Sequence, residues 1–333
     1  MVDPNVERMF DVFSVLILVS VLCTFGCASE GADDDSDSGT SDSDSDTGDV
    51  PPKRIVAIGD NHADLSQALK ALQIGGVIDQ SLNWIGGDTI VVQTGDIVDR
   101  GVEEREVIDF YENLRLEAEA AGGQVVNMNG NHEIMTAYAD YRYLQEEACA
   151  AFSDLTGLDT SNPAFDEFTD EDCKLRAAAF WPGGPYAQII ADWLMVAVVQ
   201  DTVFVHGGVH QKHLDYGIDE INAMTRAWLM GEGNLDYNQV GGGPDVFSVD
   251  WDRTYSDDEI PPTADQCDDL ASVLEQLGVV RMVVGHTVQS HINTVCDDMA
   301  WRIDTGMAVY YGGVVEVIEI LDGNINVLVD LAE

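Results

Sequence analysis

The chain has 333 residues and a formal net charge of −46, because 61 Asp and Glu side chains outnumber 15 Lys and Arg side chains. So few cations cannot neutralise a phosphate backbone, which excludes a nucleic-acid partner held by charge. The same charge disfavours docking to an anionic membrane surface. Apolar residues make up 45% of the chain, which excludes a wholly disordered protein and allows one large domain or two ordinary ones.

The N-terminal region has the pattern of an export signal. Residues 12–25 form an uncharged, mostly apolar run that is too short to span a bilayer comfortably and suits the core of a signal peptide. The run is followed by Gly26-Cys27, which resembles a bacterial lipoprotein cleavage site. We expect residues 1–27 to be a lipoprotein-type signal segment with a lipid on Cys27. The alternative is an ordinary secretory signal cut near Ala28.

Residues 28–50 are rich in Asp and Ser, with nine acidic residues and no basic one. Such a segment cannot bury enough surface to offset its chain entropy, so we expect a disordered, self-repelling linker. Calcium binding by its acids is the less favoured interpretation. These features predict an exported protein of a bacterial cell envelope, periplasmic or anchored in the outer membrane, whose only membrane contact is the lipid on Cys27.

Four further cysteines follow the signal segment, at positions 149, 173, 267 and 296. An even number in an exported chain permits two disulfides, and three pairings are open. Pairing by sequence neighbourhood would join Cys149 to Cys173 and Cys267 to Cys296. Free buried thiols are the alternative.

From residue 53 onward, short apolar runs alternate with helical patterns. Strands are predicted at 54–58, 89–93, 124–128, 194–200, 202–205 and 279–284. Helices are predicted at 65–74, 103–121, 217–230 and 265–277, with a helical, irregular insert at 133–188 and a long loop at 231–262. The alternation predicts βαβ units and a buried, largely parallel sheet. A β meander is predicted at the end of the chain, at 292–295, 300–303, 314–321 and 324–329.

Five of the predicted strands end in a glycine turn with side chains that bind metals. The turns are Gly59-Asp60-Asn61-His62, Gly95-Asp96-Ile97-Val98-Asp99-Arg100-Gly101, Gly130-Asn131-His132-Glu133, His206-Gly207-Gly208 and Gly285-His286-Thr287. In open α/β sheets, ligands bind beyond the carboxyl ends of the strands, and glycine lets the chain turn tightly there. Carboxylate, amide and imidazole ligands together suit Mn, Fe or Zn.

In this order the five motifs resemble those of the calcineurin-like metallophosphoesterases. The second and third motifs resemble the phosphoprotein phosphatase branch, and Gly285-His286-Thr287 and Asp304-Thr305-Gly306 are similar to its bacterial Shewanella-like members. The resemblance runs from about Arg54 to Gly313. It implies the α/β four-layer metallophosphoesterase fold, a two-sheet β-sandwich flanked by helices, over residues 51–333.

The resemblance also implies a ligand set for two divalent or trivalent metal ions. The first metal ion would be held by Asp60, His62 and Asp96, and Asp96 would bridge to a second ion. That second ion would also be held by Asn131, His206 and His286. Two such ions clamp phosphate oxygens and activate a water molecule.

The remaining motif residues would act on the substrate. His132 would be the general acid and Asp99 would orient its ring, while Arg100 would bind the phosphate in a bidentate fork, with Asn131 beside it. A second phosphate-binding arginine is expected, with Arg253 as first choice and Arg226 as the alternative. Tyr310 and Tyr311 are candidates to line the pocket, although aromatic packing is the simpler interpretation.

The predicted function is a dinuclear-metal-dependent phosphatase of phosphomonoesters, with phosphoproteins carrying phospho-Ser/Thr or phospho-Tyr among its substrates. The alternatives are a dinucleoside polyphosphate hydrolase and a non-catalytic, metal-binding surface lipoprotein. One position departs from the family pattern, which has glycine where this chain has Ala63. If that position requires a positive φ, alanine costs about 1 kcal/mol. Three histidines match no motif: His210, His213 and His291.

Overall fold

The computed structural model describes residues 53–330. The predicted signal segment 1–27 and linker 28–50 therefore lie outside the described residues. None of the helices in the described part is both long and apolar enough to cross a membrane.

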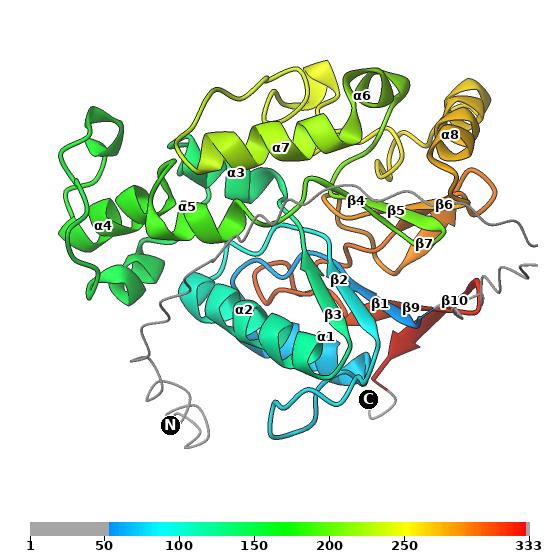
Figure 1. Cartoon of the computed structure of the whole chain (residues 1–333), viewed down its shortest axis with the longest axis horizontal. Coiled ribbons are helices and arrows are strands. Elements are labelled where there is room, and N and C mark those ends of the chain that lie inside the picture. Colours follow the sequence, from blue (N-terminus) through cyan, green and yellow to red (C-terminus); the bar gives the residue numbers. More distant parts are fainter. Residues whose placement is uncertain (1–52, 331–333) are drawn as a thin grey trace, which may run out of the picture. The chain divides into compact units, whose positions relative to one another are not determined.

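Within the described residues, ten strands form two five-stranded sheets, with the orders β10-β9-β1-β2-β3 and β4-β5-β6-β8-β7 (Figure 1). The first sheet contains β1 (Ile55–Ile58), β2 (Ile90–Gln93), β3 (Gln124–Asn127), β9 (Glu316–Leu321) and β10 (Asn324–Val329). The second contains β4 (Val196–Val199), β5 (Thr202–Val205), β6 (Arg281–Val284), β7 (Asn293–Val295) and β8 (Ala300–Arg302). β1, β2 and β3 are mutually parallel, and so are β5, β6 and β8.

The two sheets face each other across a common apolar core. Alternate residues of β1, Ile55 and Ala57, contribute to this core, because successive side chains of a strand point to opposite faces. Phe204 of β5, Val283 of β6 and Ile318 of β9 pack into it as well. This arrangement confirms the predicted two-sheet sandwich.

Helices cover the outer face of each sheet. α1 (Leu65–Ile74) and α2 (Glu104–Ala120) contact β9 and β3 of the first sheet, whereas α7 (Ile218–Leu229) and α8 (Ala264–Leu277) share an apolar cluster with the second sheet. α8 begins at the capping box of Thr263 and Gln266 and ends at Gly278, which adopts the left-handed conformation with φ of 68°. These four helices confirm the predicted ones. The short helix α6 (Gln211–Tyr216) was not predicted from the sequence.

All four strands predicted at the end of the chain are present, and β7 pairs antiparallel with β8 and β9 with β10, but the prediction that they form one meander is wrong. β7 and β8 join the second sheet, where β8 lies parallel to β6, whereas β9 and β10 join the first sheet, where β9 lies antiparallel to β1. The segment 303–315 between β8 and β9 passes from one sheet to the other. Apolar alternation identifies a strand, but it does not specify which of two sheets the strand extends.

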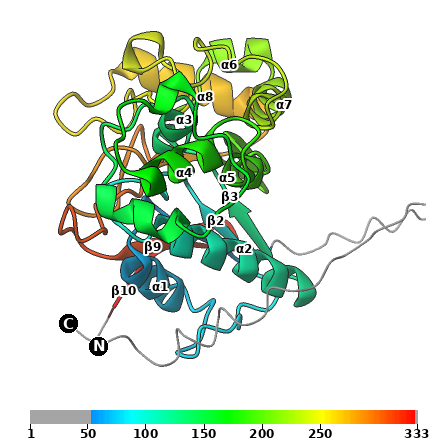
Figure 2. The same ribbon diagram turned by 90° about the vertical axis from the view of Figure 1, so that its left-hand side faces the viewer.

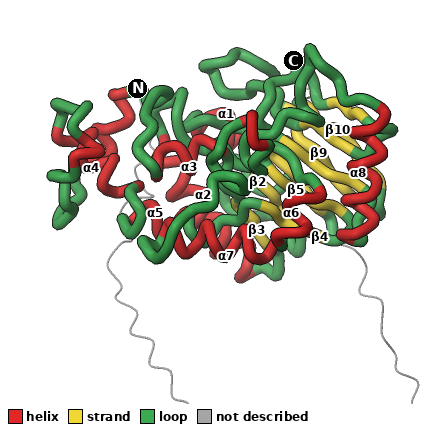
Figure 3. Tube along the Cα trace, turned by 90° about the horizontal axis from the view of Figure 1, so that it is seen from above, coloured by secondary structure: helices red, strands yellow, loops and turns green. Residues whose placement is uncertain are grey.

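Residues 138–190, here called the helical insert, follow helix α3 (Asn131–Ala137). The insert contains η2 (Glu146–Phe152), η3 (Pro163–Phe165), α4 (Glu171–Phe180) and α5 (Pro185–Ile190). Figure 2 shows α4 and α5 facing the viewer, and Figure 3 shows α4 on the side of the domain away from most of the strands. A small apolar cluster around Tyr141 and Phe165 packs within the insert.

The structure contains both disulfides that sequence neighbourhood suggested. Cys149–Cys173 joins η2 to α4 inside the insert, and Cys267–Cys296 joins α8 to the turn between β7 and β8. Each bridge joins two segments that no sheet hydrogen bonds hold together, and so closes a loop of the chain. Closing such a loop restricts the unfolded chain and stabilises the fold.

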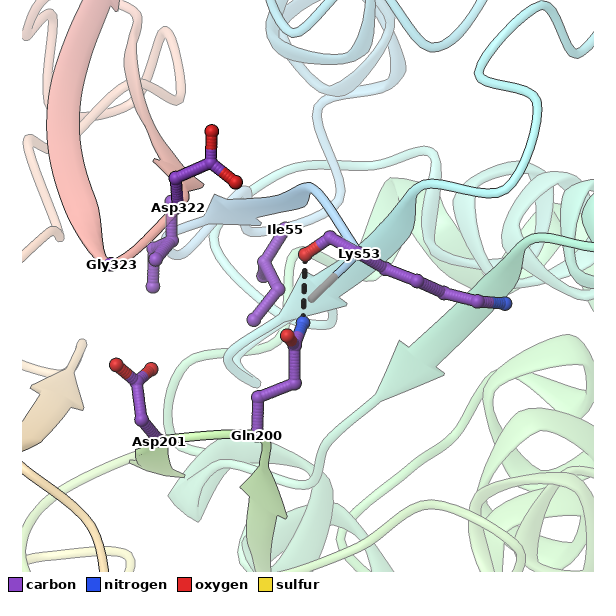
Figure 4. Close-up of a pocket in the computed structure, with 7 residues that line it drawn as sticks. Lys53, Ile55, Gln200, Asp201, Asp322 and Gly323 are labelled. Atoms are coloured by element: carbon purple, nitrogen blue, oxygen red, sulfur yellow. Dashed lines mark hydrogen bonds between the residues drawn. The ribbon is translucent and has the colours of Figure 1, made fainter. Parts of the chain in front are cut away.

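The two sheets are also joined where β1 begins. The Gln200 side chain donates a hydrogen bond to the Lys53 carbonyl at 2.7 Å (Figure 4). Arg281 pairs with Asp201 at 3.0 Å and donates to the Gly323 carbonyl at 2.9 Å. The Gln200–Lys53 and Arg281–Gly323 contacts bridge the sheets at the strand ends opposite the five glycine turns, whereas the Arg281–Asp201 pair lies within the second sheet.

Candidate metal centre and active site

The five glycine turns follow the carboxyl ends of β1, β2, β3, β5 and β6. Because these strand ends share one edge of the sandwich, their polar side chains converge and are all buried: Asp60, His62, Asp96, Asn131, His132, His206 and His286. The structure thus assembles one site from residues spread over more than two hundred positions of the sequence.

Two glycines allow the second and third turns to approach each other. Gly95 has a φ of 98°, and a Cβ atom there would lie 2.4 Å from the Gly130 nitrogen. A Cβ atom on Gly130 would lie 2.1 Å from the Oδ1 atom of Asp96. Any larger residue would push the two turns apart, which explains the glycine at both positions.

Glu133 fixes the turn that carries Asp96. Its fully buried carboxylate accepts hydrogen bonds from the backbone N–H groups of Asp96, Ile97, Val98 and Gly130 at 2.7–3.1 Å. Asp96 itself has a φ of 55°, which an L-residue rarely adopts without support. The Glu133 carboxylate provides that support. Glu133 belongs to the third glycine-turn motif, but the sequence does not show this role.

One group of possible ligand atoms meets at His206. Its Nε2 atom lies 3.2 Å from Asp96 Oδ2, 3.1 Å from Asn131 Oδ1 and 3.2 Å from His286 Nδ1. The Nδ1 atom of His206 faces the Thr94 carbonyl at 2.9 Å, so this nitrogen carries a proton. Burial opposes a second proton, but the charges of Asp96 and Asp60 outweigh it and raise the pKa of His206 to about 10, so a metal ion bound at Nε2 would replace that proton. Lone pairs that converge in this way fit a metal cation.

His62, on the other side of Asp96, also presents an imidazole nitrogen that can bind a metal ion. Its Nδ1 atom faces the Val98 carbonyl at 3.2 Å, and its Nε2 atom lies 3.8 Å from Asp96 Oδ2. Burial lowers the pKa of His62 to about 4, which keeps the ring neutral and able to bind a metal. Asp96 is therefore shared by two groups of possible ligands, His62–Asp96–His132 and Asp96–His206–His286.

Asp60 lies in the site but belongs to neither of these two groups. Its carboxylate accepts the His286 N–H at 3.0 Å and lies beside the buried acid Asp304. Burial and the charge of Asp304 raise the pKa of Asp60 well above its usual value. Bound cations would offset this accumulation of buried negative charge.

His132 and Asp99 form a hydrogen-bonded pair. The Nδ1 atom of His132 lies 2.7 Å from Asp99 Oδ2, and both side chains are buried. His132 lines the cleft and is also a member of the group His62–Asp96–His132. Burial opposes protonation of His132, but the charges of Asp96 and Asp99 outweigh it and raise the pKa of the ring. A protonated imidazole at this position can donate a proton from Nε2 into the cleft.

The cleft is small and polar. It is lined by His62, Asp96, Arg100, Asn131, His132, Tyr143, Trp251, Arg253, His286 and Tyr311. Of the two candidates for a second arginine, Arg253 lies in the cleft with its guanidinium carbon 6.0 Å from the Trp251 ring. Arg226 lies on α7, forms a 3.0 Å ion pair with Asp192 and is absent from the cleft lining.

Aromatic rings hold Arg100 in place. Its guanidinium carbon lies 3.7 Å from the centre of the Tyr143 ring, and its Nη1 atom donates to the Tyr310 hydroxyl at 3.2 Å. Tyr311 lines the cleft itself, with its ring centre 5.3 Å from that of His62. Neither Tyr143 nor Trp251 was predicted from the sequence to belong to the site. Trp251 could have been found from its place two residues before the candidate Arg253. Nothing in the sequence pattern of the insert identifies Tyr143.

Ala63 adopts the left-handed conformation, with a φ of 55°. Its N–H donates to the Ile97 carbonyl at 2.6 Å, so the strained turn is held against the turn that carries Asp96. The neighbouring His62 stays buried in the site. The three histidines without a motif lie outside both ligand groups, and two of them pair with acids: His210 with Asp252 and His291 with Glu316.

A two-sheet sandwich with Asp, Asn and His ligands at one edge defines a metallophosphoesterase. Residues 53–290 match the profile of the calcineurin-like phosphoesterase family, and the chain belongs to this family. It is a hydrolase of phosphoric esters that acts on phosphorylated substrates, in a family that uses divalent metal ions.

Among its relatives, the chain is 39% identical over 304 residues to Shewanella-like protein phosphatase 2 of Arabidopsis thaliana, covering 81% of this chain and 75% of the relative. It is 27% identical to Shewanella-like protein phosphatase 1 of Plasmodium berghei, covering 77% and 68%. The solved structure of a cold-active protein tyrosine phosphatase shares the fold, with a TM-score of 0.65 at 23% identity, covering 83% of this chain and 78% of that one.

Proposed function

We propose that the chain is a dinuclear-metal-dependent phosphatase that hydrolyses phosphomonoesters, with phosphoproteins as substrates. The observation that carries this proposal is the position of Asp96, whose Oδ2 atom lies 3.8 Å from His62 Nε2 and 3.2 Å from His206 Nε2. Asp96 lines the same cleft as His132, Arg100 and Arg253. Relatives named protein phosphatases support the choice of phosphoproteins.

Two metal ions, Mn, Fe or Zn, would occupy the site. The first would be held by Asp60, His62 and Asp96, and the second by Asp96 together with Asn131, His206 and His286. Bound there, they would supply positive charge to the phosphate and lower the pKa of the attacking water.

The protein side chains carry out the rest of the reaction. Arg100 and Arg253 hold the phosphate through charged hydrogen bonds and orient the phosphorus atom. As water forms the new P–O bond and releases its proton to solvent, the bond to the ester oxygen breaks. That oxygen leaves with the bonding electron pair and takes the proton from Nε2 of His132. Asp99 keeps the imidazole oriented and stabilises its charge.

We also propose that the protein is exported and works in the cell envelope. The disulfides Cys149–Cys173 and Cys267–Cys296 support this location, because such bonds persist in oxidising compartments and are rare in the cytosol.

Hydrolysis of p-nitrophenyl phosphate by the purified chain tests the proposed function. We expect turnover with added Mn, loss of turnover with a chelator and recovery when the metal is restored. A phosphopeptide and diadenosine tetraphosphate assayed in parallel separate a phosphatase from a dinucleoside polyphosphate hydrolase. Chelator-resistant turnover, or no turnover by folded protein with Mn, Fe or Zn, would contradict the proposal.

Arg253 and Arg226 are distinguished by a pair of variants. Arg253→Met should lower kcat/KM for a phosphomonoester by about 10–100-fold, the cost of roughly 1.5–3 kcal/mol for a charged hydrogen bond. Arg226→Met should leave kcat/KM unchanged, because that side chain is 55% exposed and pairs with Asp192 outside the cleft. Steady-state kinetics of both variants decide the assignment, and a larger loss from Arg226→Met would reverse it.

A further inference from the structure

A buried arginine of the helical insert reaches the residue that holds His132. Arg176 lies on α4 and has no exposed surface. Its Nε and Nη2 atoms donate to the Glu104 carboxylate at 2.5 and 2.7 Å, and Nη2 also lies 3.6 Å from Asp99 Oδ1. Arg176 therefore faces two carboxylates at once, and one of them is the partner of His132.

Glu104 connects the same arginine to the backbone of Asp99. The Oε1 atom that accepts from Arg176 also accepts the Asp99 N–H at 2.9 Å. Asp99 has a φ of 65°, a conformation that L-residues adopt only when their surroundings enforce it. Glu104 thus holds the Asp99 backbone, while Arg176 and His132 contact opposite oxygens of its carboxylate.

The charges in this region require a cation at the position of Arg176. Asp99 and Glu104 are both fully buried acids, and burying two carboxylates side by side is costly without a positive partner. Asp99 Oδ1 has no hydrogen-bond partner among the described residues, which leaves the guanidinium of Arg176 as its nearby counter-charge.

We infer that Arg176 is a positioning residue for catalysis: it fixes Asp99 so that His132 presents its Nε2 proton to the leaving oxygen. The helical insert is then part of the catalytic apparatus, because α4 supplies this arginine. The inference rests on the proposed role of His132 as general acid. It assigns no contact between Arg176 and the substrate.

The chain offers a matched control in Arg105. This arginine of α2 also ties the body of the domain to the insert, through Asp154 and the Ala151 carbonyl. Its side chain is 24% exposed, and it is absent from the cleft lining. Arg105→Met removes an insert-anchoring arginine without touching Asp99, so it reports the purely structural effect of loosening the insert.

The decisive variant is R176M/E104Q. It removes both members of the buried Arg176–Glu104 ion pair, so Glu104 is not left as a buried charge without its arginine, and the glutamine amide keeps an acceptor for the Asp99 N–H. Asp99 loses the guanidinium near Oδ1 and keeps His132 as its partner at Oδ2. R176M alone serves as a second variant, and thermal unfolding with metal analysis identifies the folded, metal-loaded samples. The readout is kcat on two esters, p-nitrophenyl phosphate with a good leaving group and phenyl phosphate with a poor one.

Displacing a general acid lowers kcat most for the ester with the poor leaving group, because its leaving oxygen depends most on receiving a proton. We expect R176M/E104Q to lower kcat on phenyl phosphate by about ten-fold or more and on p-nitrophenyl phosphate by about two-fold or less. KM and metal content should be unchanged, and R105M should leave the ratio of the two kcat values as in the unaltered chain.

His132→Asn, measured on the same two esters, distinguishes a failure of the inference about Arg176 from a failure of the proposed general-acid role of His132. If this variant changes the kcat ratio and R176M/E104Q does not, the inference about Arg176 is overturned while the proposed function stands. If His132→Asn leaves the ratio unchanged, the general-acid role itself fails, and the positioning role of Arg176 fails with it.

Discussion

Replacing Asp96 by asparagine is expected to remove bound metal and abolish most of the phosphatase activity. The Oδ2 atom of Asp96 lies 3.2 Å from His206 Nε2 and 3.8 Å from His62 Nε2, and no other carboxylate in the described part of the chain belongs to both ligand groups. Substituting even an outer partner of a metal ligand costs about 10–100-fold in metal affinity or activity, so loss of a shared ligand should cost more than about 100-fold.

Asparagine tests the charge of Asp96 rather than its shape. Asparagine has the same shape, and its amide oxygen can still accept the hydrogen bond from the backbone N–H of His132 that Asp96 Oδ1 accepts at 3.0 Å. Metal content and kcat on p-nitrophenyl phosphate are the two measurements, with the exposed Asp88→Asn as a charge-matched control. A variant that keeps two metal ions and normal turnover would contradict the shared role, and so would the loss of only one ion.

The sequence was sufficient to predict the polar turns, because each one is a short local pattern. Apolar runs such as 54–58 stop at a glycine, and parallel strands bring such turns to the same edge of a sheet. The order of the motifs then indicated the family, which the match over residues 53–290 confirms. Local signals of this kind survive folding because neighbouring residues in the chain remain neighbours in the turn.

Features that depend on distant parts of the chain could not be predicted. Tyr143 and Arg176 come from the insert, whose mixed aromatic and acidic residues show no period that would aim a side chain at the site. The sheet that each C-terminal strand joins depends on long-range pairing such as that of β9 with β1. Sequence alone also left Arg253 and Arg226 as alternatives, because only the folded loop brings Arg253 into the cleft.

Replacing His132 by asparagine is expected to lower kcat by about 10²–10⁴-fold, the usual contribution of a general acid. The metal content should stay unchanged, because Nδ1 of His132 is engaged by Asp99 at 2.7 Å and the proposed ligands are other residues. The loss should be largest for esters whose leaving oxygen needs a proton. An asparagine side chain preserves polarity but cannot donate a proton as an acid, so it isolates this step.

His291→Asn is the matched control for His132→Asn. His291 has a 68% exposed side chain, pairs with Glu316 at 2.7 Å and does not line the cleft, so its substitution should leave kcat unchanged. Metal analysis and kcat on a good and a poor leaving group complete the comparison. If His132→Asn loses metal, His132 acts as a ligand, in keeping with its closeness to His62 and Asp96, rather than as the acid. If it retains both metal and full activity on the poor leaving group, the leaving oxygen takes its proton from another source.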